Sequence, residues 1–322
     1  MGSAVVPLYR LLVDTNIMAF SNLYSAVCRG KWFVSFREVE SNLLVVDKLL
    51  ERDFDSQDTG RLSEREAIPL MIATKDGRSA RLGNSFSDAP QGSTAIIPVH
   101  GTMLKYGTYC SYGTTEYAAL IRDAADSANI SSVLCDIDSG GGAVDAIAPL
   151  VDAILYAKSK GKAVVAHCDL CASAAYYAAS YCDEIIASNT ISAEFGSIGV
   201  MMSFPDYAKY YENAGVKVHT IYSNLSDYKN APFEAAKKGD YASIRDEELD
   251  PLARDFQANV RKNRGECLKQ ETEGLLRGRM FYAEDALKVG LIDSIGNQDY
   301  AVQRSREINA EMTINNYINS KS

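Results

Sequence analysis

Several segments of this chain combine a serine with small residues, a composition that suits nucleophilic chemistry. In the stretch Cys168–Tyr177, CDLCASAAYY, an apolar run changes into an alanine-rich run around Ser173. Small flanking residues let a substrate backbone approach, and a helix start leaves free N–H groups beside the hydroxyl. The same pattern also fits a serine in a buried alanine helix, with its hydroxyl bonded to the preceding turn.

Three consecutive glycines, Gly140 to Gly142, follow the apolar run SSVLCDID. Glycine adopts backbone conformations closed to other residues and leaves its N–H group exposed, so this segment could form an oxyanion hole. A phosphate-binding loop is disfavoured, because the lysine and the Ser/Thr of a P-loop are absent after these glycines. A tight turn between a strand and a helix remains the alternative.

A nucleophilic serine needs a base, and the chain offers histidines and a lysine for that role. The histidines His100, His167 and His219 lie within apolar strand-like runs, where a core position is the commoner role. A lysine can act as the base when burial and the absence of a paired carboxylate lower its pKa. Lys229, in the loop segment NLSDYK, is that candidate, and a solvated loop lysine is the alternative.

Cys168 and Cys171 form a C-x-x-C motif, which could mark a redox pair near a helix start. The other cysteines lie at scattered spacings, at Cys28, Cys110, Cys135, Cys182 and Cys267. The dispersed histidines do not supply a second pair of zinc ligands. We therefore expect buried free thiols in a reducing compartment, and neither redox nor metal function is favoured.

The composition is that of an ordinary globular protein with an acidic balance. The 322 residues are 47% hydrophobic and 23% charged, and the formal net charge is −9. No block is rich in lysine and arginine, which argues against nucleic acid or an anionic membrane as the main partner. No run reaches the roughly 18 uncharged apolar residues of a membrane span, and the first residues lack a secretory signal pattern. The sequence therefore predicts a soluble, intracellular protein.

Alternating strands and helices must position these residues. Apolar runs that predict buried strands lie at 94–101, 131–138, 163–170, 184–188 and 216–223. Between the first three of these runs, apolar residues recur at helical spacing, which predicts crossover helices at 115–128 and 143–161. This alternation predicts an α/β fold with a parallel sheet covered by helices on both faces. Sites in such a sheet form at the carboxyl ends of the strands, where the glycines, Ser173, Ser197 and Lys229 would meet.

The composition divides the chain into three parts. Residues 1–92 are expected to form an N-terminal helical extension, with an amphipathic helix at 36–54 and a turn-rich linker before residue 93. Residues 93–300 would be the catalytic domain, which contains a long charged helix at 239–264. Residues 301–322 would be a polar C-terminal tail without a motif.

The order of the motifs resembles that of the signal peptide peptidase A family of serine peptidases. A strand with GGG is followed by CASAAYYAAS, EIIAS, GSIGV and SDYK, and the resemblance covers about residues 94–296. This family includes the phage and prophage head-maturation proteases, and its fold is shared with the Clp protease and crotonase group. The family usually has proline where this chain has Gly140, which predicts a more flexible turn here. The family's membrane anchor is absent, so the phage and prophage type is the most similar.

The resemblance implies a serine endopeptidase with a Ser/Lys dyad and no metal, nucleotide or organic cofactor. Ser173 would be the acylated nucleophile, Lys229 the general base, and Ser197 the residue that orients the lysine amine. The backbone N–H groups of Gly141 and Ala174 would hold the oxyanion. The resemblance also places substrate-binding residues at Gly142, Gly196, Ile198 and Gly199.

The resemblance further implies peptide or protein substrates and a biological setting. That setting would be phage or prophage capsid maturation, or the degradation of signal-peptide-like peptides. It would place the protein in the bacterial host cytoplasm or inside a phage prohead, with capsid or scaffold proteins as partners. Since the dyad of this family can be completed between domains or subunits, and one such domain is expected here, we expect a homo-oligomeric ring. Two alternatives on the same fold remain: a crotonase-like acyl-CoA enzyme that does not need Ser173, and a non-catalytic assembly subunit.

Overall fold

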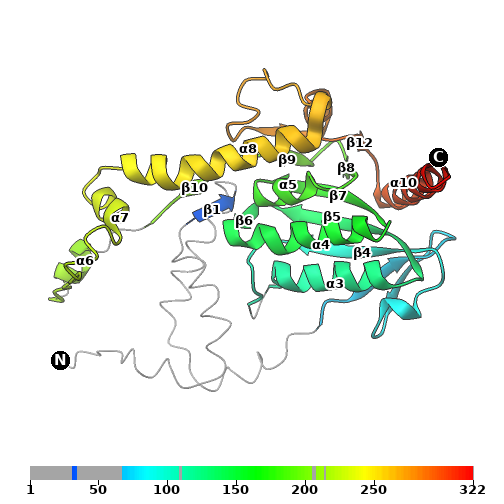
Figure 1. Ribbon diagram of the computed structural model, residues 1–322, viewed down its shortest axis with the longest axis horizontal. Helices are drawn as coiled ribbons and strands as arrows, with labels where there is room; N and C mark the ends of the chain where they lie inside the picture. The colour runs from blue at the N-terminus through cyan, green and yellow to red at the C-terminus, as the bar shows by residue number, and fades with distance from the viewer. Residues whose placement is uncertain (1–30, 35–66, 109–110, 205–207, 214, 322) are drawn as a thin grey trace.

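The fold is taken from a computed structural model of the chain. It describes residues 31–34, 67–108, 111–204, 208–213 and 215–321 (Figure 1). The helix predicted at 36–54 and the cysteines Cys28 and Cys110 lie outside these described residues. Among the described residues, no helix combines the length and the apolar character needed to cross a bilayer.

A mixed, mainly parallel sheet forms the centre of the described part of the chain, in the order β11-β9-β7-β5-β4-β2-β3. β4, β5 and β7 run parallel to one another. The strands of this sheet are β2 (Leu70–Ala73), β3 (Ser79–Leu82), β4 (Ser93–His100), β5 (Ile130–Ser139), β7 (Ala163–Ala172), β8 (Glu184–Ala187), β9 (Glu194–Gly196), β11 (Met280–Tyr282) and β12 (Ser294–Ile295). The predicted α/β fold with a parallel sheet is confirmed.

Strand β7 is long enough to pair with two successive strands along one edge. Its first half, Val165–Cys168, pairs in parallel with β8, which also pairs with β12. Its last three residues, Leu170–Ala172, pair in parallel with β9. This exchange of partners brings β9 beside the point where β7 ends and the residue Ser173 begins the next turn.

Helices cover both faces of the sheet, which explains why its central strands are almost continuously apolar. One face packs against α3 (Thr114–Asp126), α4 (Ile147–Ser159) and α5 (Ala174–Ala179). The opposite face presents residues such as Leu134 and Val165 to α10 (Gln298–Asn319). Figure 1 shows α3, α4 and α5 together on one side of the strands, and α10 on the other.

Residues 301–319, predicted as a polar tail, lie within helix α10. The helix buries a narrow stripe that consists of Ala301, Val302, Ser305 and Ile308. Ser305 Oγ lies 2.9 Å from Ser132 Oγ of β5. Because two of these four residues are small or polar, the stripe does not stand out in the sequence. The last helix is a layer of the fold.

The sheet also begins earlier in the chain than the predicted boundary at residue 93. The apolar segment LMIA forms β2, which pairs antiparallel with both β3 and β4. Further upstream, β1 (Lys31–Val34) lies in a separate three-stranded sheet. Its neighbours there are β6 (Gly141–Ala143) and β10 (Met201–Met202). Part of the predicted extension is therefore paired with the predicted catalytic domain.

The strand predicted at 216–223 is wrong. This segment has no regular structure, and apolar side chains near it are exposed, 91% for Ile221 and 95% for Leu225. It belongs to an arm, residues 203–243, that carries the short helices α6 (Ala208–Asn213) and α7 (Ala231–Ala236). Figure 1 shows these helices away from the sheet, beyond the N-terminal end of α8 (Asp250–Arg264). The apolar residues of this segment favour a strand locally, but no strand of the described residues pairs with it.

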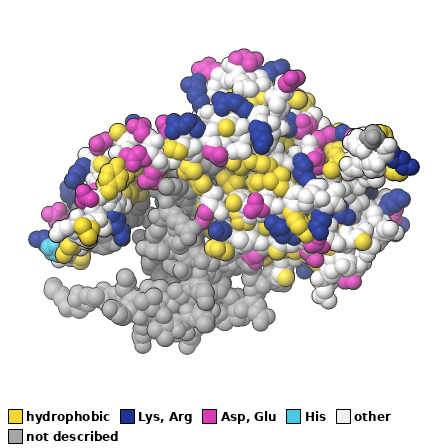
Figure 2. Space-filling model, in the orientation of Figure 1, with side chains coloured by type: hydrophobic (Ala, Val, Ile, Leu, Met, Phe, Trp, Pro, Cys, Tyr) yellow, Lys and Arg dark blue, Asp and Glu magenta, His cyan; other side chains and the backbone are white. Residues whose placement is uncertain are grey.

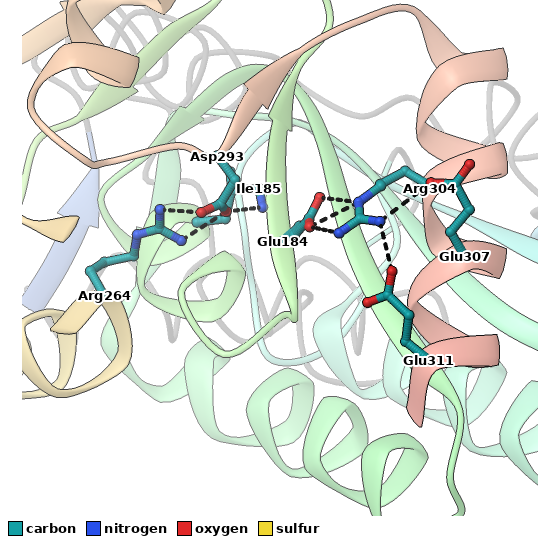
Figure 3. A network of polar contacts seen from close by, with 7 residues as sticks. All are labelled: Glu184, Ile185, Arg264, Asp293, Arg304, Glu307 and Glu311. Atoms are coloured by element: carbon teal, nitrogen blue, oxygen red, sulfur yellow. Dashed lines mark hydrogen bonds and ion pairs between the residues drawn. The ribbon is translucent and has the colours of Figure 1, made fainter. Parts of the chain in front are cut away.

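Two ion-pair groups attach α8 and α10 to opposite sides of β8 (Figure 3). Arg264 of α8 donates to both carboxylate oxygens of Asp293, at 2.9 and 2.7 Å. Asp293 in turn accepts the Ile185 N–H of β8 at 2.7 Å. Arg304 of α10 binds Glu184 of β8 at 2.6 Å. The two arginines thus link α8, through Asp293, and α10 to the same strand, β8.

The substitution Arg264→Ala is expected to lower the free energy of unfolding by about 3 kcal/mol, because it leaves a partly buried carboxylate without its partner. The Arg264 side chain is only 7% exposed. Lys288→Ala is the matched control, because its ion pair with Asp285 is exposed and should contribute less than about 1 kcal/mol. Urea unfolding curves measure both values, and equal losses for the two variants would contradict this assignment.

Candidate active site

Ser173 occupies the sharp turn between β7 and α5. Its φ is 54° and its ψ is −118°, and the residue is the N-cap of the helix. A residue other than glycine in such a backbone region costs about 1–3 kcal/mol and persists only where its surroundings enforce it. Here the Ser173 N–H donates to the Gly196 carbonyl of β9 at 2.8 Å. The exchange of strand partners along β7 thus holds the strained turn in place.

The Ser173 hydroxyl is buried, and the described residues offer it no hydrogen-bond partner. The residue is 1% exposed, and its Oγ is one of three buried side-chain oxygens that lack a partner among the described residues. A buried polar group left unsatisfied costs about 1–3 kcal/mol. A serine that served only to pack the helix would bond back to the preceding turn, as Ser180 does to Tyr177 at 2.7 Å. The hydroxyl of Ser173 does not do so.

Gly196 and Ser197 form a second strained turn beside the serine. Gly196 has a φ of 124°, and a Cβ on it would lie 2.3 Å from the Arg279 carbonyl oxygen. Ser197 has a φ of 52°, and its N–H donates to the same carbonyl at 3.1 Å. The chain entering β11 therefore fixes this turn from the side opposite Ser173. The half-buried Ser197 directly follows the residue that accepts the Ser173 N–H.

The glycine segment passes close to another part of the backbone. The Met103 N–H donates to the Gly141 carbonyl at 2.8 Å, and the Met103 carbonyl accepts the Ala143 N–H at 2.9 Å. A Cβ on Gly142 would lie 2.0 Å from the Met103 carbonyl oxygen, so only glycine fits there. The segment forms β6, which packs against α5. The glycines are thus brought alongside the serine, as the sequence predicts.

The two predicted oxyanion donors differ in their present bonding. Ala174 supplies the first N–H of α5, which has no acceptor within its helix. The Gly141 N–H donates to Ser139 Oγ at 3.1 Å, and the Ser139 hydroxyl donates to the Gly101 carbonyl at 2.6 Å. Gly141 would have to exchange this acceptor for an oxyanion.

The remaining predicted substrate-binding residues divide between core and surface. Ile198 is fully buried and belongs to the main apolar core. Gly199 is half-buried, and a Cβ added there would meet nothing within 4 Å. Of this pair, only Gly199 lies beside open space that a substrate could fill.

Lys229 is exposed on the arm and does not reach the serine within the described part of the chain. Its N–H closes a turn by donating to the Ser226 carbonyl at 3.1 Å. Figure 1 places the neighbouring helix α7 far from α5. The burial expected for a lysine base is therefore absent here, and the predicted dyad is not assembled within the described residues.

The histidines lie elsewhere. His100 and His167 flank Asp136, with Nε2 and Nδ1 at 3.3 and 3.2 Å from its carboxylate oxygens. Along β5, Asp136 alternates with the core residues Cys135 and Ile137, so it points to the α10 face and away from α5. His219, predicted in a strand, is exposed and outside any strand. None of the three serves as a base for Ser173 in this arrangement.

The Asp136 group predicts a pH dependence of stability. Burial alone would raise the pKa of Asp136, but the hydrogen bonds from His100 and His167 outweigh burial and lower the pKa. The bond to Asp136 raises the pKa of His100 although burial opposes it. A lowered carboxyl pKa stabilises the fold above about pH 4, and a raised histidine pKa stabilises it below about pH 6.5. The contribution of Asp136 and His100 to the free energy of unfolding should therefore be largest between about pH 4 and pH 6.5.

Unfolding by urea from pH 3 to pH 8 measures this effect as the difference in stability between the wild type and Asp136→Asn. The difference should shrink as the pH falls below about 4 and as it rises through the raised pKa of His100. The exposed Asp123→Asn serves as the control and should show no such maximum. A difference that is constant with pH would contradict the assignment.

The C-x-x-C cysteines pack in the core. Cys135, Cys168, Cys171 and Cys182 are buried free thiols, as the sequence predicts, whereas Cys267 is exposed. Burial raises the pKa of the Cys168 thiol well above its usual value. A thiol with a raised pKa is a poor nucleophile, so these cysteines do not resemble a redox pair.

Comparison with known families places these features in context. A family model described as peptidase family S49 matches residues 156–313. The matched region contains β7, Ser173, the turn at Gly196 and Ser197, and Lys229.

Curated relatives include both phage and cellular proteins. The head-tail preconnector protein GP5 of Enterobacteria phage P21 is 30% identical over 217 residues, which cover 65% of this chain and 42% of that protein. The capsid assembly protease C of Escherichia phage lambda is 24% identical over 251 residues, covering 76% and 56%. Protease 4 of Haemophilus influenzae is 26% identical over 217 residues, covering 66% and 34%. The chain thus spans roughly a third to just over half of these relatives.

Similar solved structures include a mutant of the membrane-bound stomatin-specific protease 1510-N, with a TM-score of 0.35 and 15% identity over 67% of this chain and 85% of that chain. An enoyl-CoA hydratase/isomerase family protein from Silicibacter pomeroyi has a TM-score of 0.38 and 13% identity, covering 72% and 82%. These scores are too low to support a functional argument. The family model and the relatives agree with the order of the motifs, so the predicted resemblance is confirmed: residues 156–313 match the model of peptidase family S49.

Proposed function

We propose that this chain is a serine endopeptidase that hydrolyses peptide bonds in protein substrates, with Ser173 as the nucleophile. One observation carries the proposal: the Ser173 hydroxyl is buried on a strained turn at the carboxyl end of a parallel strand, and no residue in the described part of the chain bonds to it. Both the strain and the unsatisfied hydroxyl cost stability, and packing gives no reason to keep either. A reactive hydroxyl aimed at an incoming carbonyl would explain both.

In the proposed mechanism, Ser173 Oγ attacks the carbonyl carbon of the substrate while its proton passes to the neutral amine of Lys229. The N–H groups of Ala174 and Gly141 donate hydrogen bonds to the oxyanion. Gly141 first breaks its hydrogen bond to Ser139 Oγ. The lysine then protonates the leaving amine, and an acyl group remains on Ser173. A water molecule, deprotonated by the same lysine, attacks this ester and releases the second product. Ser197 would orient the lysine amine.

We propose further that Lys229 reaches the Ser173 of another copy of this chain. The arm that carries Lys229 exposes apolar side chains, with Ile221 at 91%, Leu225 at 95% and Tyr228 at 72%. Figure 2 shows hydrophobic side chains at the surface of this arm. Clustered exposed apolar residues mark an interaction surface, and an arm that extends from its own sheet suits a homo-oligomeric ring. Burial in that interface would also take the lysine amine out of water, which favours the neutral amine, the form that a base needs, over the ammonium.

The relatives suggest a setting for this activity. They include a phage capsid assembly protease and a phage head-tail preconnector protein. We propose that the substrates are capsid or scaffold proteins, and that cleavage takes place in the bacterial host cytoplasm or inside a prohead. The proposed peptidase unit includes both β2 and α10. β2 is a strand of the central sheet, and α10 covers one face of that sheet.

Covalent labelling tests the proposed function. The full chain, at a concentration where it is oligomeric, is incubated with a fluorophosphonate probe and with a peptide library, and both are analysed by mass spectrometry. We expect one phosphonylated peptide, which contains Ser173, and cleavage within the library. An oligomer that neither labels nor cleaves would instead support the non-catalytic assembly subunit.

A further inference from the structure

The strand β1 fills a gap between two parts of the proposed active site. It pairs antiparallel with β6, which is the glycine segment, and also antiparallel with β10, which follows the turn at Gly196 and Ser197. The two flanking strands are therefore parallel to each other and two strand spacings apart, about 9–10 Å. Figure 1 shows β1, in dark blue, beside β6 and apart from the central sheet. Without β1, the described strands leave a slot that is one strand wide.

The glycine segment turns its free edge toward this slot. Gly141 and Ala143 use their C=O and N–H groups, respectively, on Met103. Since successive residues of a strand direct these groups to opposite edges, the N–H and C=O of Gly142 point the other way. Phe33 of β1 lies opposite Gly142 in the register, and Val34 lies opposite Gly141. The main chain of β1 thus faces the N–H and C=O of Gly142, which the family resemblance assigns to substrate binding, and passes Gly141, which it assigns to the oxyanion hole.

We propose that the slot between β6 and β10 is the peptide-binding groove of this chain, and that its own segment Lys31–Val34 occupies it as an intramolecular competitor of substrate. An exposed strand edge takes an extended peptide by main-chain hydrogen bonds, which suits a peptidase that must bind many sequences. This inference rests on the proposed function. It adds that the chain's N-terminal part holds the groove closed, so that substrate must displace β1.

A disulfide trap tests whether the strand sits in the groove, independently of catalysis. Lys31 and Met202 are register partners, and Cα atoms of antiparallel partners lie about 4.5–5.5 Å apart, within the range of a disulfide. The full chain carrying Lys31→Cys and Met202→Cys, with Cys28→Ser to remove a nearby thiol, should form an intramolecular disulfide under mild oxidation. Lys31→Cys with Met201→Cys is the matched control, because Met201 points to the opposite face. Peptide mapping by mass spectrometry should find the bond in the first protein alone.

A second measurement tests the competition with substrate. Phe33→Pro removes the N–H that faces Gly142, whereas Phe33→Ile keeps both the N–H and the preference for a strand. Phe33→Pro should increase both fluorophosphonate labelling of Ser173 and peptide hydrolysis by about tenfold or more, because proline is excluded from the interior of a sheet. Phe33→Ile should behave as the wild type. A synthetic peptide of residues 28–38 should suppress the gain in Phe33→Pro competitively.

The outcomes separate this inference from the proposed function. Equal labelling and hydrolysis by the wild type and Phe33→Pro would overturn the competition while leaving the peptidase intact. Equal cross-linking of the register pair and its control, or a disulfide only between chains, would overturn the occupancy of the groove by the same chain. If no protein labels or cleaves, the proposed function fails and the competition with it. The trap still determines in that case whether β1 lies between β6 and β10.

Discussion

The variant Ser173→Ala is expected to hydrolyse peptides at least about 10,000-fold more slowly than the wild type, because the acyl-enzyme can no longer form. The residual rate would come from substrate binding and the oxyanion donors alone. The fold should survive, since the change removes a buried hydroxyl that has no partner among the described residues. It should even unfold at a slightly higher urea concentration, because the cost of that unsatisfied group disappears.

Ser180→Ala is the matched control for this experiment. Ser180 is also a buried serine and lies at the other end of helix α5, where its hydroxyl donates to the Tyr177 carbonyl. Its hydroxyl also accepts a hydrogen bond from Asn263 Nδ2 at 3.1 Å. Replacing Ser180 should leave kcat within about twofold and should lower the stability by about 2 kcal/mol, the net value of two hydrogen bonds. Peptide hydrolysis followed by mass spectrometry, with circular dichroism as the check of folding, measures both effects. Full activity of Ser173→Ala would sink the nucleophile assignment and favour a crotonase-like enzyme.

A mixture of Ser173→Ala and Lys229→Ala subunits is expected to recover activity that neither variant has alone. If each site takes its serine from one copy and its lysine from the next, random mixing leaves about a quarter of the sites intact, since each partner is correct half the time. Each pure variant, carried through the same dissociation and reassembly, should stay at background. The expected gain over that background is thus more than about 100-fold, given the size of a catalytic defect in this kind of site.

Differently tagged variants make this result decisive. Co-purification of the two tags proves that mixed oligomers have formed before activity is measured. Mixed oligomers without activity would show that the dyad lies within one chain, which would require the arm to fold back toward its own α5. The exposed position of Lys229 and the separation of α7 from α5 in Figure 1 support recovery of activity in the mixed oligomers.

The central strands could be predicted because their apolar runs are long and uninterrupted. β4, β5 and β7 were predicted within about two residues of their ends, and the turn after β7 follows from the alanine-rich run around Ser173. The strain at Ser173 could not be predicted, since it depends on the bond from its N–H to Gly196 in a distant segment. The local sequence therefore predicts where the serine lies. Its unusual backbone conformation depends on the pairing of β7 with the distant strand β9.

The errors arose where tertiary contacts overrule local pattern. Residues 216–223 are rich in β-branched and apolar side chains, which favours a strand, but no strand of the described residues lies beside them. The sequence predicts a tail where helix α10 lies, because the buried stripe of that helix includes Ala301 and Ser305 rather than large apolar residues alone. The pairing of β1 with β6 joins segments about a hundred residues apart, and nothing within Lys31–Val34 specifies that partner. The contact proposed for Lys229 lies in another copy of the chain, so no local pattern in the sequence specifies it.

Hydrogen bonds link α10 to the end of β2, which lies more than 200 residues earlier in the chain. This separation has a consequence for folding during synthesis. Arg306 donates to the Ala73 and Thr74 carbonyls, 233 and 232 positions earlier. At about 5–20 residues per second, a ribosome needs roughly 10–50 s to add that length of chain. During this interval the apolar face that includes Leu134 and Val165 lacks its covering helix. This apolar face of the nascent protein therefore stays exposed until α10 has been synthesised and can pack against it.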